Sequence, residues 1–142
     1  MNCTPVSDLG DIQRAYPLLA EACLRVGQRE GESYFAPEIY AAVTAGQWVL
    51  FVVRDKGEML GLVICRCQVE PGDGTKSLFV LVAYVVPGSP PDALAAGFKA
   101  CKLYAKQCGA KTIQFVSKRA GWARRAQQLG YKPSRQVYEL EV

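Results

Sequence analysis

The sequence predicts an α+β domain built on one mixed, mostly antiparallel sheet with four flanking helices. Three strand-like segments joined by tight turns lie between residues 48 and 86, which is the pattern of an antiparallel meander. An amphipathic helix over 92–109 leads to a further strand, and a strand reached through a helical crossover lies parallel to the one before it. With 142 residues, half of them hydrophobic, the chain can bury a core. We expect residues 1–142 to form one domain.

Two helices are expected before the first strand. Ser7 is a suitable N-cap for the first helix, whose apolar residues recur at three- and four-residue spacing as far as Val26. Pro17 lies inside that repeat, so we expect a kink or a restart there. The polar, glycine-containing stretch 27–33 predicts a loop, and a second short helix follows over 37–46.

The meander follows these helices. Residues 48–54 form its first strand, and the turn at 55–58 returns the chain as a second strand over 59–69. Proline and glycine residues at 71–74 mark another turn. The third strand is the apolar run Leu78–Val86. All three strands are therefore expected to pair with a sequence neighbour.

The remainder of the chain alternates helix and strand. Gly109 is a natural left-handed end for the crossover helix, and residues 112–116 form the parallel strand. A short helix with Trp122 on its inner side ends at Gly130. Alternating side chains over Gln136–Val142 then predict a terminal strand.

Composition argues against several classes of function. No apolar run approaches the roughly 18 residues of a membrane span, and residues 1–5 lack the regions of a secretion signal. We expect a cytoplasmic protein whose six cysteines are reduced, mostly buried thiols. With no histidine and no C-x-x-C pair, we expect neither a metal site nor a histidine-based catalytic triad.

Charge is distributed unevenly along the chain. Residues 99–142 hold ten basic and two acidic side chains, whereas residues 1–98 hold seven basic and eleven acidic ones. The basic third is either a surface for an anionic ligand or acidic partner, or a set of ordinary solvated helix faces. It lacks a helix-turn-helix or a platform of stacked aromatics, so nucleic-acid binding is not favoured.

The order of elements resembles the GNAT superfamily of N-acetyltransferases. The stretch Ala123–Pro133 is similar to the family's A-x-x-L/F-Y-x-x-L-G-F ending, and 108–113 resembles the usual approach to its fifth strand. The compact chain is similar to small divergent members carried by bacteriophages. The resemblance implies a sheet whose parallel strand pair splays apart, with acetyl-CoA in the wedge between the two strands.

The resemblance also implies where acetyl-CoA would lie. Its pantetheine arm would pair with the backbone of Tyr84, Val85 and Val86. Its diphosphate would contact the N-terminus of the following helix, here called the helix mouth, at Gly88, Ser89 and Asp92. In family members this helix mouth has a glycine-rich Q/R-x-x-G-x-G/A loop, because glycine lets backbone N–H groups approach the phosphates.

This chain departs from that loop. Ser89 is placed as the N-cap, which puts Pro90 and Pro91 at the first two helical positions, where neither has an N–H to donate. Asp92 at the third position satisfies donors itself and repels a diphosphate. Each donor lost to a charged acceptor is worth about 1.5–3 kcal/mol. We therefore expect binding of acetyl-CoA or CoA to be weak or absent.

The catalytic positions of the family are also altered. A tyrosine that acts as general acid in many members is replaced by Ala126, which leaves Tyr131 or Tyr84 as substitutes. Glu70 and Glu32 are the candidate bases that the resemblance offers, although some family members rely on bulk water. As packed aromatics, either tyrosine would have no catalytic role.

The substrate or partner surface is implied by the loop between the first two helices. Tyr34 and Phe35 lie there, and Trp122 borders the expected cleft. Two functions follow. In the first, a non-catalytic GNAT-like protein binds and modulates a partner protein, for instance one of a bacterial host. In the second, an active N-acetyltransferase acts on an amine of a small molecule or protein. A dimer is compatible with both.

Overall fold

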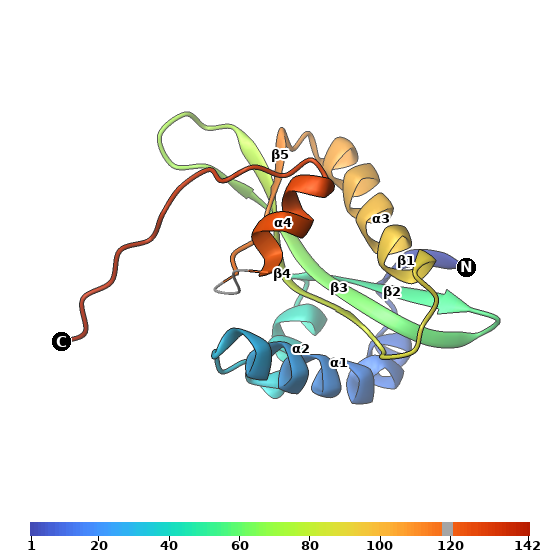
Figure 1. The fold of residues 1–142 in the computed structure, drawn as a ribbon. Coiled ribbons are helices and arrows are strands. Elements are labelled where there is room, and N and C mark those ends of the chain that lie inside the picture. Colours follow the sequence, from blue (N-terminus) through green and yellow to red (C-terminus); the bar gives the residue numbers. More distant parts are fainter. Residues whose placement is uncertain (118–120) are drawn as a thin grey trace.

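The computed structural model describes residues 1–117 and 121–142, and contains one five-stranded sheet in the order β1-β2-β3-β4-β5 (Figure 1). Its neighbours pair antiparallel except β4 and β5, which are parallel. The strands are β1 (Asn2–Val6), β2 (Val49–Asp55), β3 (Glu58–Val69), β4 (Lys76–Val85) and β5 (Thr112–Gln114). The helices are α1 (Leu9–Glu30), α2 (Ala36–Thr44), α3 (Asp92–Cys108) and α4 (Gly121–Gln128). The predicted α+β class is confirmed.

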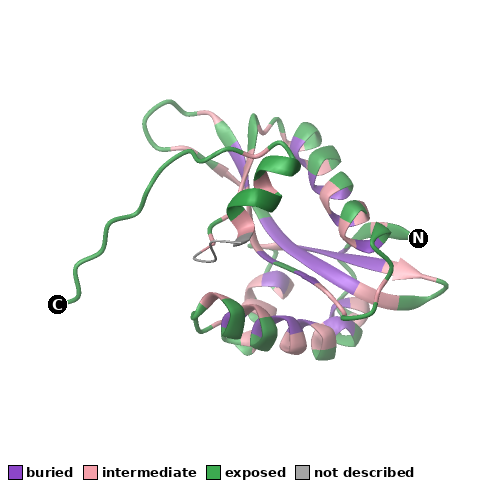
Figure 2. Cartoon of the chain, in the orientation of Figure 1, coloured by how far each residue is buried: buried purple, intermediate pink, exposed green. Residues whose placement is uncertain are grey.

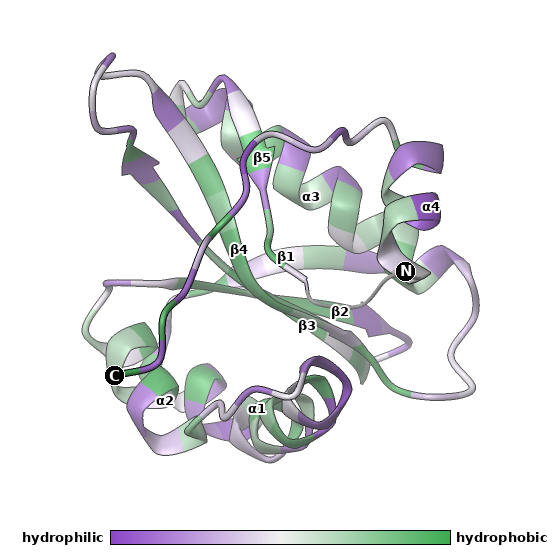
Figure 3. Ribbon diagram, turned by 60° about the vertical axis from the view of Figure 1, so that its left-hand side comes forward, coloured by the Kyte–Doolittle hydropathy of each residue, from purple (hydrophilic) through white to green (hydrophobic). Residues whose placement is uncertain are grey.

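Two helical layers enclose the sheet. Helices α1 and α2 cover one face and α3 covers the other, so most strand positions in the centre of the sheet are buried (Figures 1 and 2). Apolar residues follow β2, β3 and β4 along their length (Figure 3). The first layer centres on Leu19, Leu50 and Ile64, and the second on Phe51, Cys65 and Cys101. Burial on both faces explains the long apolar runs of these strands.

The first strand was not predicted. β1 pairs antiparallel with β2, from Asn2 opposite Arg54 to Val6 opposite Leu50. Only Val6 of β1 is buried, and Pro5 interrupts its pattern. An edge strand tolerates both features, because one side of its backbone needs no partner. The sequence signal of such a strand is weak for the same reason.

The first helix is longer than predicted. Asp8, not Ser7, is its N-cap, and the Asp8 carboxylate accepts a hydrogen bond from the N–H of Asp11 at 3.1 Å. The helix continues through Pro17 without a restart and reaches Glu30, so most of the predicted loop over 27–33 is helical. The restart offered as one alternative at Pro17 does not occur, because one lost hydrogen bond is outweighed by the buried stripe that α1 packs on the sheet.

The terminal strand predicted over 136–142 is also wrong. Residues 131–142 form neither helix nor strand, and the tail runs away from the sheet as an exposed segment (Figures 1 and 2). An alternating pattern predicts a strand only when a neighbouring edge supplies hydrogen-bond partners. In this structure Arg135 forms an ion pair with Glu70 at 3.0 Å, and the residues after it have left the sheet.

All six cysteines are free thiols. Cys23, Cys65 and Cys101 are buried, and the other three are partly buried. Within 1–117 and 121–142, no helix has the length and apolar character that crossing a membrane requires. The same ranges contain no group of three or more histidine, cysteine or carboxylate side chains arranged to hold a metal ion.

Candidate functional site

A bulge in β4 opens the sheet next to β5. Ile64 of β3 pairs with Val82, but the next residue of β3 pairs with Val80, so Leu81 is an extra residue in β4. A bulge bends its strand and increases the local twist. β5 pairs with β4 only as far as Phe79. The parallel pair therefore separates immediately before the bulge, as the splayed pair of the sequence prediction requires.

The bulge determines which backbone groups face the opening. Val86 donates its N–H to the carbonyl of Leu60 at 2.8 Å, so its polar groups face β3. Hydrogen-bonded pairs alternate along antiparallel strands, so the polar groups of Tyr84 also face β3. Those of Val85 and Ala83 face the edge that β5 has left. Of the three residues predicted to contact pantetheine, only Val85 therefore turns its backbone polar groups toward the opening. Ala83, which was not predicted, does so as well.

A cleft that is open to solvent occupies the wedge between the separated strands. It is lined by the end of α1, the α1–α2 loop, the middle of β4, the segment after β5, and one residue each from α3 and α4. These residues are Val26, Arg29, Glu30, Tyr34, Val80, Leu81, Ala83, Phe98, Phe115, Val116, Ser117 and Trp122. The structure thus brings together Tyr34 and Trp122, two of the three predicted substrate or partner residues. Phe35 is not a lining residue and is 60% exposed.

Aromatic rings form one wall of this cleft. The Phe115 ring lies 5.4 Å from that of Trp122 and 5.2 Å from that of Tyr131, in edge-to-face arrangements. Tyr131 also packs against Phe98 at 6.1 Å. Burial raises the pKa of the Tyr131 phenol above its ordinary value, so the phenol stays protonated at neutral pH. The predicted general acid, Tyr131, thus contacts the ring of Phe115 but is not one of the lining residues.

A carboxylate that the sequence analysis did not single out, Glu30, also lines the cleft. Ser117 donates its hydroxyl to Glu30, with its Oγ 2.8 Å and 3.0 Å from the two carboxylate oxygens. This contact joins the end of α1 to the segment after β5. Glu30 lies in the stretch that was predicted as a loop, so the helical periodicity of α1 could not be used to predict which way its side chain points. Only the continuation of α1 through residue 30 brings its side chain to the cleft.

The predicted bases lie outside the cleft. Glu70 accepts a hydrogen bond from Ser77 Oγ at 2.5 Å and pairs with Arg135, and these contacts hold the pKa of its carboxyl below the usual range. Ser77 is the β4 residue that pairs with Thr112, at the end where β4 and β5 remain joined. Glu32 lies in the exposed loop after α1, where its N–H bonds to Gly27.

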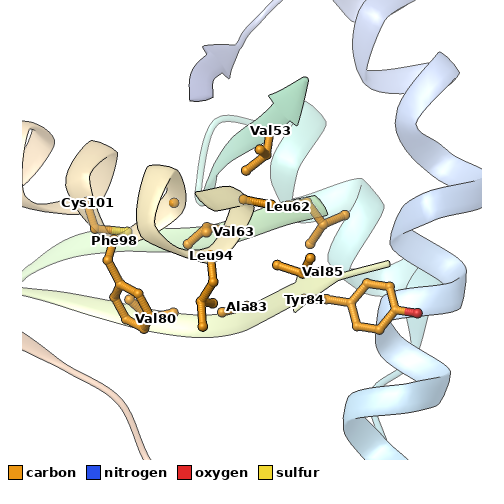
Figure 4. Close-up of a pocket in the computed structure, with 12 residues that line it drawn as sticks. Val53, Leu62, Val63, Val80, Ala83, Tyr84, Val85, Leu94, Phe98 and Cys101 are labelled. Carbon is orange, nitrogen blue, oxygen red and sulfur yellow. The ribbon is translucent and has the colours of Figure 1, made fainter. Parts of the chain in front are cut away.

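A second, narrow apolar pocket lies between the sheet and α3 and shares Val80, Ala83 and Phe98 with the cleft (Figure 4). Leu94 and Phe98 point from α3 toward β4, whereas Tyr84 points the other way, toward the α1–α2 layer (Figure 4). The Tyr84 hydroxyl is buried and has no hydrogen-bond partner within the described residues. Burial, followed by the nearby Glu21 carboxylate, raises its pKa.

The mouth of α3 differs in detail from the prediction. Pro91, not Ser89, is the N-cap, and Asp92 is the first helical residue rather than the third. The reason is the turn before it, in which Ser89 donates its N–H to the Val86 carbonyl at 3.1 Å. The Ala93 N–H is also used, by the Pro90 carbonyl at 3.0 Å. Two prolines without N–H groups and two engaged donors leave few N–H groups for an anion.

Solved structures share this arrangement across the whole chain. A ribosomal-protein-alanine N-acetyltransferase from Brucella melitensis matches with a TM-score of 0.76 and 16% identity, covering 100% of both chains. A predicted acetyltransferase with acetyl-CoA from Clostridium acetobutylicum matches with a TM-score of 0.72 and 16% identity, covering 99% of this chain and 95% of the other. The chain has the GNAT fold.

The GNAT fold also includes neighbours with other descriptions. A transcriptional regulator from Bacillus halodurans matches with a TM-score of 0.70 and 19% identity, covering 99% of both chains. No protein-family model matches the sequence, and the comparison with curated proteins finds no match. At these identities the similarity establishes the fold and leaves the activity to the site itself.

Proposed function

We propose that this GNAT-fold protein holds the diphosphate of CoA poorly and acts by binding a partner protein at the rim of its cleft. The observation that carries the proposal is the mouth of α3. Pro90 and Pro91 provide no N–H groups, and those of Ser89 and Ala93 already bond to backbone carbonyls. The carboxylate of Asp92 adds a negative charge at the position where a diphosphate would gather.

The wedge and the mouth fit different parts of the cofactor. Within the described residues no strand pairs with the outer backbone edge at Ala83 and Val85, and this edge suits the amide groups of a pantetheine arm, which can add to it like a short strand. The mouth does not suit the diphosphate. Two missing donors at about 1.5–3 kcal/mol each correspond to a loss of roughly 10²- to 10⁴-fold in affinity.

A comparison of two ligands tests this directly. Calorimetry would measure the affinities of acetyl-CoA and of S-acetylpantetheine, which lacks the diphosphate and the nucleotide. We expect the two affinities to agree within about tenfold, because the mouth contributes little. Binding of acetyl-CoA more than about a hundredfold tighter would overturn the proposal.

The partner surface combines the cleft rim with the basic third of the chain. Phe35 is 60% exposed, and Tyr34, its neighbour in the sequence, lines the cleft. Exposed aromatic groups beside a pocket are among the side chains that anchor protein interfaces. The exposed Arg124 and Arg125 of α4 add positive charge, which favours an acidic partner.

Affinity capture from bacterial lysate, followed by a matched pair of variants, tests the partner surface. Phe35→Ala should remove a captured protein, because it deletes an exposed aromatic at the rim. Leu103→Ala is the control, since Leu103 is similarly exposed but lies on α3. Equal capture by both variants would rule out this surface.

An active N-acetyltransferase is the second candidate, and Glu30 is the observation that favours it. Its carboxylate lines the cleft beside Tyr34 and is oriented by Ser117. A carboxylate in that place can accept the proton that an acceptor ammonium must lose before it attacks a thioester. Release of free CoA thiol in the presence of amines, abolished by Glu30→Gln, would establish this function instead.

A further inference from the structure

Five of the six cysteines gather on the side of the sheet that α3 covers. Cys3 lies on β1, Cys65 and Cys67 lie on β3, and Cys101 and Cys108 lie on α3. Residues two apart on a strand share a face, so Cys67 faces α3 as Cys65 does. Residues seven apart on a helix also share a side, so Cys108 faces the sheet as Cys101 does. The thiols therefore form an inner pair, Cys65 with Cys101, and an outer pair, Cys67 with Cys108.

Backbone contacts hold the end of α3 beside the outer part of β3. Lys111, just after α3, donates its N–H to the carbonyl of Lys76 at 2.8 Å. Lys76 is two residues before Leu78 on β4, and Leu78 pairs with Cys67. Small residues on the inner side of α3 let the helix lie close to the sheet: Gly97, Ala100, Cys101 and Ala105. Close approach matters, because a disulfide requires its two Cα atoms to lie within about 7 Å.

The two pairs differ in their access to solvent. Within each pair the thiols interact directly, Cys65 with Cys101 and Cys67 with Cys108. The inner thiols are buried, since Cys65 is 0% and Cys101 2% exposed. The outer two are only partly buried. A reagent from solution can therefore reach the outer pair while the inner pair stays covered.

Two neighbouring groups favour a thiolate at the outer pair. Burial and the Cys108 thiol raise the pKa of Cys67, and the ammonium of Lys76 opposes that rise. The Tyr104 phenol interacts with Cys108. Burial, followed by this contact, raises the pKa of Tyr104 to about 12, so the phenol keeps its proton at neutral pH and can donate a hydrogen bond to sulfur. Since the thiolate is the nucleophile in disulfide exchange, both neighbours assist reaction at this pair.

We propose that Cys67 and Cys108 form a redox-sensitive dithiol, which a low-molecular-weight disulfide such as glutathione disulfide converts into a bond between β3 and α3. One protein thiolate attacks a sulfur of the reagent, forms a mixed disulfide and releases one glutathione thiolate. The second protein thiolate then attacks the protein sulfur of the mixed disulfide and releases the other. Two protein thiols are oxidised, one reagent disulfide is reduced, and the two thiol protons pass to the released glutathione. The proposal is independent of what the cleft binds.

The test equilibrates the folded full chain in buffers of reduced and oxidised glutathione, blocks the remaining thiols by alkylation and maps the peptides by mass spectrometry. We expect a bond between Cys67 and Cys108 that dithiothreitol reverses. Cys67→Ser should abolish this cross-link and leave a mixed disulfide on Cys108. Cys101→Ala is the matched control, because it removes a thiol of the inner pair, and it should keep the cross-link. Thermal melting of each reduced variant confirms that it is folded.

Melting of the oxidised chain gives a second readout. The cross-link closes a loop of about 40 residues, so it should raise the melting temperature by roughly 10 °C, and Cys67→Ser should show no such rise.

Three results would overturn the proposal. Mixed disulfides that never close would show that the two sulfurs cannot meet. A cross-link that persists in Cys67→Ser would use Cys3 or the inner pair. A cross-link that forms only in urea would belong to the unfolded chain.

Discussion

Ser117 and Glu30 are 87 residues apart in the chain and are joined by one hydroxyl, whose oxygen lies 2.8 Å and 3.0 Å from the two carboxylate oxygens. Because β4 and β5 have already separated at this level, the contact spans the wedge rather than the sheet. It connects the end of α1 to the segment after β5 across the cleft.

Ser117→Ala should therefore loosen the cleft. Loss of one hydrogen bond to a charged acceptor is expected to lower the free energy of unfolding by about 1.5–3 kcal/mol at most. Amide exchange at Arg29 and Glu30 should accelerate, since the last turn of α1 loses its tether. Glu30→Gln should change exchange less, because its amide oxygen still accepts the hydroxyl. Unchanged amide exchange in Ser117→Ala would show that the contact does not stabilise the last turn of α1.

The mouth of α3 has few N–H groups that can bind an anion, so restoring such groups should increase the affinity for acetyl-CoA. Pro90→Gly combined with Pro91→Ala restores two N–H groups at the mouth of α3. Each donor that reaches the diphosphate should tighten binding of acetyl-CoA by about tenfold or more, but should leave S-acetylpantetheine unchanged. Pro71→Ala in the β3–β4 turn is the matched control. Equal affinity of the double variant and the parent would mean that the prolines are not what limits binding.

Gly61 should tolerate no side chain, whereas Gly97 should. A Cβ at Gly61 would lie 2.5 Å from the backbone oxygen of Tyr84, which cannot move without disturbing β4. Gly61→Ala should cost about 1–3 kcal/mol of stability. A Cβ at Gly97 would lie 3.4 Å from a methyl group of Val63. Gly97→Ala should be neutral or stabilising, because alanine is favoured by about 1 kcal/mol in a helix. Urea unfolding of both variants checks the difference.

The Glu70 carboxyl should titrate below its ordinary pKa of 4.5, mainly because Ser77 donates to its charged form and also because Arg135 does. A group whose pKa is lowered by folding stabilises the fold above its ordinary pKa. That contribution is lost as the pH falls from 4.5 through the lowered value. Carboxyl ¹³C shifts measure the titration directly.

Ser77→Ala should raise the Glu70 pKa toward its ordinary value, and Arg135→Gln should raise it too. Asp73 is a useful internal reference, because its own lowered pKa depends on Thr75 instead. Titration of Glu70 at or above its ordinary value in the parent chain would contradict the observed contacts.

Most of the fold could be predicted from local patterns. The turn at 55–58 carries Lys56 and Gly57 with positive φ, which suits a two-residue hairpin, and the two strands beside it follow. Gly109 ends α3 in the left-handed conformation, and the crossover makes β5 parallel. These features depend on neighbours in the sequence or on the handedness of the connection.

Other features had no local signal. The bulge at Leu81 appears only in the pairing of β3 with β4, because a run of apolar residues gives no register. Continuation of α1 through Pro17 depends on the packing of its buried face on the sheet. The alternating tail was predicted as a strand, yet its pairing depends on an edge that the sequence cannot place.

The sequence by itself determined most of the elements from α1 to α4, their order, and the chemistry at the N-terminus of α3, since prolines lack an N–H in any fold. The tertiary structure decided how the strands separate, and with it which backbone groups and side chains meet in the wedge. The physical reason is range: caps, turns and periodicity act within a few residues, whereas the separation of β4 from β5 and the contact of Glu30 with Ser117 join distant segments.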